Sequence, residues 1–335
     1  MEKRKLLSWC ISLGILAALG WFFREELDFL QEGLRRLRHA ELGPVLLVTV
    51  FSFGGVAAMS QVMRLLLAAG DNRVPLRETF AISMASNAWS TTLPAGPAFA
   101  AVLTFQVQRR WGASVALCSY FLFISALVSS MWLALIGIAG VFFLKVDMAL
   151  GSLLATVALM MVAMAVIFWM TEHPAEVSRW LGRRSFRGAR RLAAEMQHFH
   201  GIHLSRWAFS RVATWSLLHR LLDLLALWAS VWAVTGQPPL FHAAENHTTI
   251  AGVALAYLTA KLAGSAQVTP AGLGTVEAAI ITPLVATGLT AVDATSAAVI
   301  YRLISFALVT IIGWIIYFAH YARQGLTYQA LNRKD

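Results

Sequence analysis

Two stretches of this chain carry the same Pro-Ala-Gly sequence inside otherwise apolar segments. Residues 94–96 and 270–272 lie 176 positions apart, and the lone glycines that follow them, Gly112 and Gly288, keep the same separation. A Pro-Gly break frees backbone N–H and C=O groups that lipid cannot satisfy. Such breaks persist in a membrane only where protein or water covers them. Corresponding breaks in two halves of a chain are typical of transporters that bind their substrate near the membrane midplane.

The composition is that of a membrane protein. Of its 335 residues, 58% are hydrophobic and 13% are charged, whereas roughly 25% are charged in a soluble domain. A membrane-spanning helix needs about 20 apolar residues. The expected fold class is therefore an all-α polytopic integral membrane protein. Full spans are expected at residues 6–23, 43–69, 114–143, 148–170, 209–235 and 293–320, and two broken segments, each a re-entrant pair of short helices, at 78–110 and 248–288.

The basic residues indicate an orientation. The net charge is +10, but the lysines and arginines cluster in short segments between the spans, which favours contact with anionic lipid over nucleic acid. The N-terminus and the basic loop 171–208 are expected in the cytoplasm, and the loop 236–247, without Lys or Arg, outside. The C-terminus returns to the cytoplasm after six crossings.

This orientation makes the two broken segments enter the membrane from opposite sides. Residues 1–335 are expected to form one membrane domain, with a first repeat half at 1–145 and a second at 146–335. Similar halves in opposite orientation form an inverted-topology repeat, an architecture that supports alternating access. The alternative is chance similarity between helices rich in glycine and alanine.

The second break carries the strongest candidate site. Pro270, Gly272 and Gly274 let the backbone turn, and Thr275 and Glu277 follow in the first turn of the next helix. The N–H groups at such a helix start suit a phosphate or a carboxylate. Glu277 has two interpretations. It is either a helix-capping residue or a functional acid at membrane depth, where a carboxylate is costly enough to indicate function.

Further polar residues lie in the neighbouring apolar segments. Arg302 lies about ten residues into the last span and stays charged, so it needs an anionic partner, either Glu277 or a lipid phosphate. Arg220 and Asp223 are three positions apart and either neutralise each other or bind substrate. The remaining candidates are Tyr301, beside Arg302, and Lys261, on the arm that leads to the second break.

The second half also resembles a known family. The stretch Pro270-Ala-Gly-Leu-Gly-Thr-Val-Glu277, then Gly288, then Tyr301-Arg302-Leu-Ile-Ser305, resembles the lysylphosphatidylglycerol synthase transmembrane family. The resemblance implies a flippase-like protein of the bacterial cytoplasmic membrane that handles lipids, with Glu277 and Arg302 as its important positions. The chain ends shortly after its last span, so the aminoacyl-transferring domain of the bifunctional synthases is not expected here, and neither is enzyme activity.

These observations favour lipid translocation, with the headgroup held near the second break and membrane lipids as partners. No cofactor and no metal site is expected. One alternative is an ion-coupled secondary transporter of a small polar solute, which the inverted repeat would equally support. The other is an accessory scaffold that binds enzymes of lipid synthesis.

Overall fold

The computed structural model describes residues 40–93, 95–143, 169, 204–242, 244–266 and 272–322, without the side chains of 140–143. This part of the chain is helical and contains no β-strand. Its elements in chain order are α3 (Leu42–Ala68), α4 (Leu76–Thr92), α5 (Gly96–Arg110), α6 (Val115–Phe143), α10 (Arg206–Thr235), α11 (Ile250–Ala266), α12 (Thr275–Ala286), α13 (Ala291–Arg302), η3 (Leu303–Leu308), α14 (Val309–Ile316) and η4 (Tyr317–Tyr321). The all-helical class expected from the sequence is confirmed for these residues.

Four helices are long and apolar enough to cross a membrane. They cover Leu42–Ala68, Val115–Ala139, Arg206–Thr235 and the continuous run Ala291–Tyr321. These ranges match four of the six expected spans. The other two, 6–23 and 148–170, lie outside the described residues except for Trp169, and so does most of the basic loop 171–208.

The first broken segment folds as the helix pair α4 and α5. Between them Ala95 adopts the left-handed conformation, with φ of 54°, and starts α5. Gly96 then passes so close to α4 that an added Cβ would lie 2.2 Å from the carbonyl oxygen of Ser90. Only glycine fits such an approach, so Gly96 sets how tightly the two short helices pack.

The second broken segment folds as the pair α11 and α12. Residues 267–271, which include Pro270, lie outside the described part. Gly272 and Gly274 have φ of 67° and 77°, so the chain turns through conformations that favour glycine just before α12 begins. The Thr259 hydroxyl on α11 donates a hydrogen bond of 2.6 Å to the carbonyl oxygen of Ala279 on α12, which holds the arms together.

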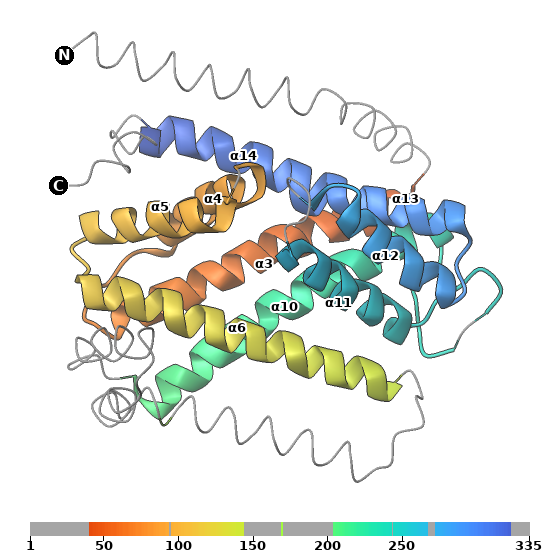
Figure 1. Ribbon diagram of the computed structural model, residues 1–335, viewed down its shortest axis with the longest axis horizontal. Helices are drawn as coiled ribbons and strands as arrows, with labels where there is room; N and C mark the ends of the chain where they lie inside the picture. The colour runs from red at the N-terminus through yellow and green to blue at the C-terminus, as the bar shows by residue number, and fades with distance from the viewer. Residues whose placement is uncertain are drawn as a thin grey trace.

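The two helix pairs occupy opposite ends of the molecule (Figure 1). The α4–α5 pair lies at the left of the view and the α11–α12 pair at the right, with α3 and α10 running between them. The connection from α3 to α4 lies at the left end, and the connection from α10 to α11 at the right end. The chain therefore enters and leaves the α4–α5 pair at one end of the molecule and the α11–α12 pair at the opposite end.

The packing of the two halves corresponds element by element. Helix α4 packs on α14 as α11 packs on α6, and α5 contacts α6 as α12 contacts α13. Helices α3 and α10 pack along each other, and each also contacts its own helix pair. Helices α6 and α13 begin at Val115 and Ala291, again 176 positions apart. The glycines before them, Gly112 and Gly288, both have positive φ.

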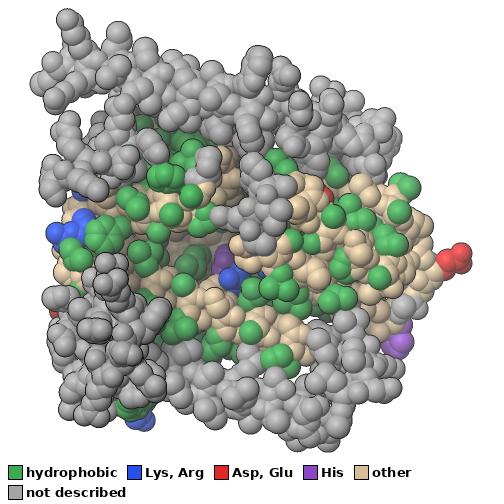
Figure 2. Space-filling model, in the orientation of Figure 1, with side chains coloured by type: hydrophobic (Ala, Val, Ile, Leu, Met, Phe, Trp, Pro, Cys, Tyr) green, Lys and Arg blue, Asp and Glu red, His purple; other side chains and the backbone are tan. Residues whose placement is uncertain are grey.

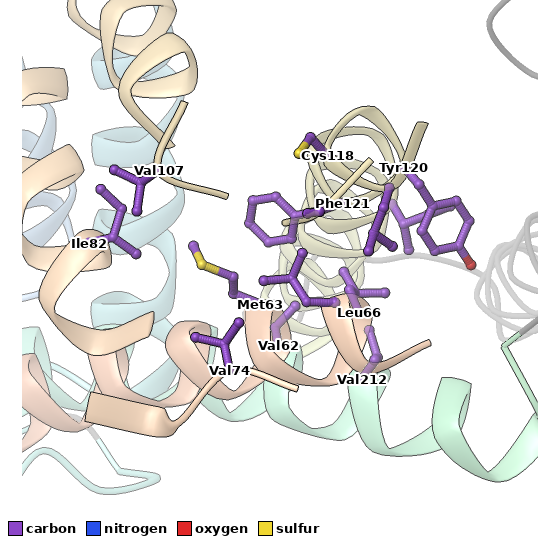
Figure 3. Close-up of a cluster of buried hydrophobic side chains, with 14 of the residues drawn as sticks. Val62, Met63, Leu66, Val74, Ile82, Val107, Cys118, Tyr120, Phe121 and Val212 are labelled. Atoms are coloured by element: carbon purple, nitrogen blue, oxygen red, sulfur yellow. The ribbon is translucent and has the colours of Figure 1, made fainter. Parts of the chain in front are cut away.

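Two separate apolar clusters stabilise these halves. The first joins α3, α4, α5 and α6 with the start of α10, and Figure 3 shows its members Met63, Ile82, Val107, Phe121 and Val212. The second joins the end of α10 with α11, α12 and α13 around buried side chains such as Tyr257 and Ile280. The second cluster also contains Tyr257 and Tyr301, whose hydroxyls bond to Asp223, so a charged side chain lies directly against this core.

Candidate functional site

A buried ion pair lies at the start of α12. The Arg302 Nε donates a hydrogen bond of 2.6 Å to Glu277 Oε1, and their side chains are only 7% and 12% exposed. The Arg302 guanidinium carbon also lies 4.1 Å from the centre of the Phe306 ring, close enough for a cation–π contact. Glu277 is thus the intramolecular partner that the sequence suggested for Arg302.

The glycine turn places Glu277 for this contact. Gly274 caps α12, and Thr275 Oγ1 donates to the carbonyl oxygen of Gly272 at 3.1 Å, so the turn is closed onto itself. An added Cβ on Gly272 would lie 2.7 Å from Val276 Cγ2. The turn therefore brings the first turn of α12, and with it Glu277, against the end of α13.

The local structure of the last span changes at this ion pair. Arg302 is the final residue of α13, and the π-helix η3 begins at Leu303. Within this segment the Ser305 hydroxyl donates to the Tyr301 carbonyl oxygen at 2.7 Å. Short π-helical stretches inside α-helices occur frequently at functional sites. The Glu277 Oε2 atom is buried and accepts no hydrogen bond from the described residues.

A second charged group centres on Asp223 of α10. Its Oδ1 accepts a hydrogen bond of 2.8 Å from the Tyr301 hydroxyl, and its Oδ2 accepts one of 3.3 Å from the Tyr257 hydroxyl. Its Oδ2 also forms an ion pair with Lys261 Nζ. Asp223 thereby connects α10 to α11 and α13 in the second half.

Arg220 is not the ion-pair partner of Asp223. The two side chains were expected either to neutralise each other or to bind substrate, and among the described residues the ion pair of Asp223 is formed with Lys261 instead. Arg220 lies near the Tyr257 hydroxyl. Its Nε atom is buried and finds no acceptor in the described part of the chain.

Lys261 and Asp223 are more accessible than Arg302 and Glu277. Their side chains are 29% and 18% exposed. Figure 2 shows basic and histidine side chains together at the middle of one face, among apolar side chains. The neighbouring His219 Nδ1 donates to the Gly55 carbonyl oxygen at 2.9 Å, which fastens α10 to α3 beside the charged group.

The structure thus brings most of the candidate residues into two adjacent groups. Tyr301 belongs to the Asp223 group and the next residue, Arg302, belongs to the Glu277 pair, so α13 joins them. Pro270 lies outside the described residues. Sequence reasoning missed Tyr257, although its spacing of four from Lys261 on an apolar helix placed both on one face.

The corresponding position of the first helix pair carries neutral contacts. Thr91 Oγ1 lies 3.1 Å from Thr310 Oγ1, and the Trp314 Nε1 donates to Thr92 Oγ1 at 3.2 Å. The Trp89 and Trp314 rings stack with centres 6.3 Å apart. Helix α4 also has a contact of 3.6 Å between Glu78 and the exposed His320, so the less exposed ion pairs between helices lie, among the described residues, in the second half.

These features define a class: a polytopic helical membrane protein with ion pairs between its helices at the second of two helix breaks. The sequence matches the family described as the lysylphosphatidylglycerol synthase TM region over residues 9–313. The chain belongs to this family, as its motifs indicated. The family is a membrane domain associated with lipid-related, flippase-like function. No curated protein matches the chain.

Proposed function

We propose that this protein moves lipids between the leaflets of the bacterial cytoplasmic membrane and binds the headgroup beside the second helix break. The observation that carries the proposal is the group of charged side chains shared by α10, α11, α12 and α13, because charges at membrane depth are costly and generally functional. Family membership supports a lipid as the substrate. The chain acts as a translocator and performs no chemistry on the lipid.

The access of the charged group favours a lipid over a small solute. A solute transporter needs a site enclosed by protein, whereas a lipid keeps its tails in the bilayer while its headgroup enters from the side. The Lys261 side chain is 29% exposed, and its neighbour Leu262 is 64% exposed. A headgroup that reaches Lys261 would therefore keep its acyl chains beside apolar surface of α11.

The halves support movement by alternating access. The matching contacts of α4 with α14 and of α11 with α6, and the placement of the helix pairs at opposite ends, are what an inverted-topology repeat requires. In this proposal both termini lie in the cytoplasm. The α3–α4 connection is then cytoplasmic, and the α10–α11 connection is external.

Cysteine labelling tests this orientation. Arg73 is exposed between α3 and α4. We expect Arg73→Cys to react with a membrane-impermeant maleimide only after the cells are permeabilised. A cysteine at Glu245, exposed between α10 and α11, should react in intact cells. Both substitutions belong in a background with Cys10 and Cys118 changed to serine. Equal reaction of the two sites in intact cells would contradict the inverted repeat.

Lipid scrambling in reconstituted vesicles tests the function. We expect the wild type to expose NBD-labelled phosphatidylglycerol of the inner leaflet to dithionite faster than protein-free vesicles do. Vesicles that enclose a soluble NBD dye control for leakage of dithionite. Wild-type protein that is folded but gives the protein-free rate would argue against translocation, and co-purification with enzymes of lipid synthesis would then favour the scaffold alternative.

A further inference from the structure

Among the described residues, the Glu277 pair and the Asp223 group together carry one positive charge more than their two acids can balance. Arg302 pairs with Glu277, and Lys261 pairs with Asp223. Arg220 is the fifth charged side chain of this group and finds no carboxylate among the described residues. An uncompensated charge at membrane depth is costly, so an anion that arrives with the substrate would supply the missing partner.

Arg220 and Lys261 both lie near the same tyrosine, Tyr257. The Lys261 Nζ lies 5.2 Å from the centre of the Tyr257 ring, and Arg220 lies near the hydroxyl of the same residue. Guanidinium and ammonium groups are the usual protein ligands of phosphate oxygens, and here both approach the same side chain. The buried Arg220 Nε also offers a donor that the described protein atoms leave unused.

Asp223 is held in a way that allows Lys261 to change partners. Its Oδ1 and Oδ2 accept hydrogen bonds from the Tyr301 and Tyr257 hydroxyls. The carboxylate therefore keeps two donors if Lys261 turns toward another anion. Lys261 is suited to this movement because its side chain is flexible and 29% exposed.

We propose that Arg220 and Lys261, and not Arg302, bind the phosphate of the lipid headgroup. This inference rests on the proposed function and assigns the residues that hold the phosphate. The Arg302–Glu277 pair is then not the phosphate site, because both side chains are nearly buried and already bound to each other. A phosphodiester carries a single negative charge, which matches the single excess positive charge of the group.

Scrambling of two labelled lipids in phosphatidylcholine vesicles tests the inference. NBD-phosphatidylglycerol carries a phosphate, and NBD-glucosylceramide does not. We expect the wild type to move the first about tenfold faster or more, since a lost charge-assisted hydrogen bond is worth about that factor. Arg220→Gln and Lys261→Gln should each remove this advantage, whereas Arg220→Lys should keep part of it. Arg211→Gln is the matched control, because Arg211 lies exposed on the same helix.

The outcomes separate the two claims. If the wild type moves both lipids equally and Arg220→Gln changes neither rate, the phosphate site is wrong and the translocation function stands. If the wild type moves neither lipid, the proposed function fails and the inference fails with it.

Thermal unfolding provides a second readout. Arg220→Gln should leave the melting temperature unchanged or higher, because it removes an uncompensated charge, whereas a loss of stability like that expected for a broken ion pair would show that Arg220 is structural.

Discussion

Replacing Glu277 by leucine should lower the free energy of unfolding by about 3–5 kcal/mol, the usual cost of removing one partner of a buried ion pair. The Arg302 side chain is 7% exposed and would lose its carboxylate partner inside the membrane region. Arg302→Met should have a similar effect, because it leaves the Glu277 carboxylate without its guanidinium. Denaturant unfolding in mild detergent, followed by tryptophan fluorescence, measures both.

The double variant Glu277→Leu/Arg302→Met should recover most of that loss, because an apolar pair of similar volume often replaces a buried ion pair without cost. Glu245→Gln is the matched control, since Glu245 is exposed in the α10–α11 connection and its change should stay within about 0.5 kcal/mol. Single variants as stable as the control would show that the two side chains do not depend on each other.

Gly313→Ala should be the most damaging glycine substitution in the packing of α14 against α4. An added Cβ would lie 2.3 Å from the carbonyl oxygen of Met84 and 2.9 Å from the Ala88 Cβ. Neither atom belongs to a flexible side-chain end, so the two helices must separate. We expect a loss of about 1–3 kcal/mol in the same unfolding measurement, the range for overpacked interiors.

Gly137→Ala is the internal control for this substitution, because Gly137 holds the corresponding position of α6 in the other half. Its added Cβ would meet Leu258 of α11 at 3.7 Å, an ordinary contact. Alanine is favoured over glycine inside a helix by roughly 0.5–1 kcal/mol, so this variant should be as stable as the wild type or more stable. Equal losses at both glycines would mean that α4–α14 and α6–α11 pack alike.

The sequence predicted the features that depend on local chemistry. The Pro-Ala-Gly stretches predicted where helices break, because proline and glycine act through their own backbone geometry. The apolar runs predicted four spans of the described structure. The Arg302–Glu277 pair was predictable because each side chain was a costly charge in an apolar segment, and few partners of opposite charge were available.

The ion pair of Asp223 with Lys261 could not be predicted from the sequence. Helical spacing suggested Arg220 as the partner, since residues three apart share a face. The actual partner comes from α11, and two tyrosines on α11 and α13 complete the contacts. Which helices meet is decided by packing of α10 against α11 and α13, and no local pattern encodes that choice. The close approach of Gly313 to α4 was hidden for the same reason.

The most direct test of the role of the second helix break in transport is the scrambling rate of the double variant Glu277→Leu/Arg302→Met, measured with NBD-phosphatidylglycerol beside the wild type. This protein should be folded and nearly as stable as the wild type, so a loss of transport cannot be attributed to unfolding. We expect a rate equal to that of protein-free vesicles, because the Arg302–Glu277 pair holds α12 against α13 and α13 carries Tyr301 against Asp223, beside the residues that bind the headgroup. A rate equal to that of the wild type would show that the ion pair is only a structural contact and that transport does not depend on it.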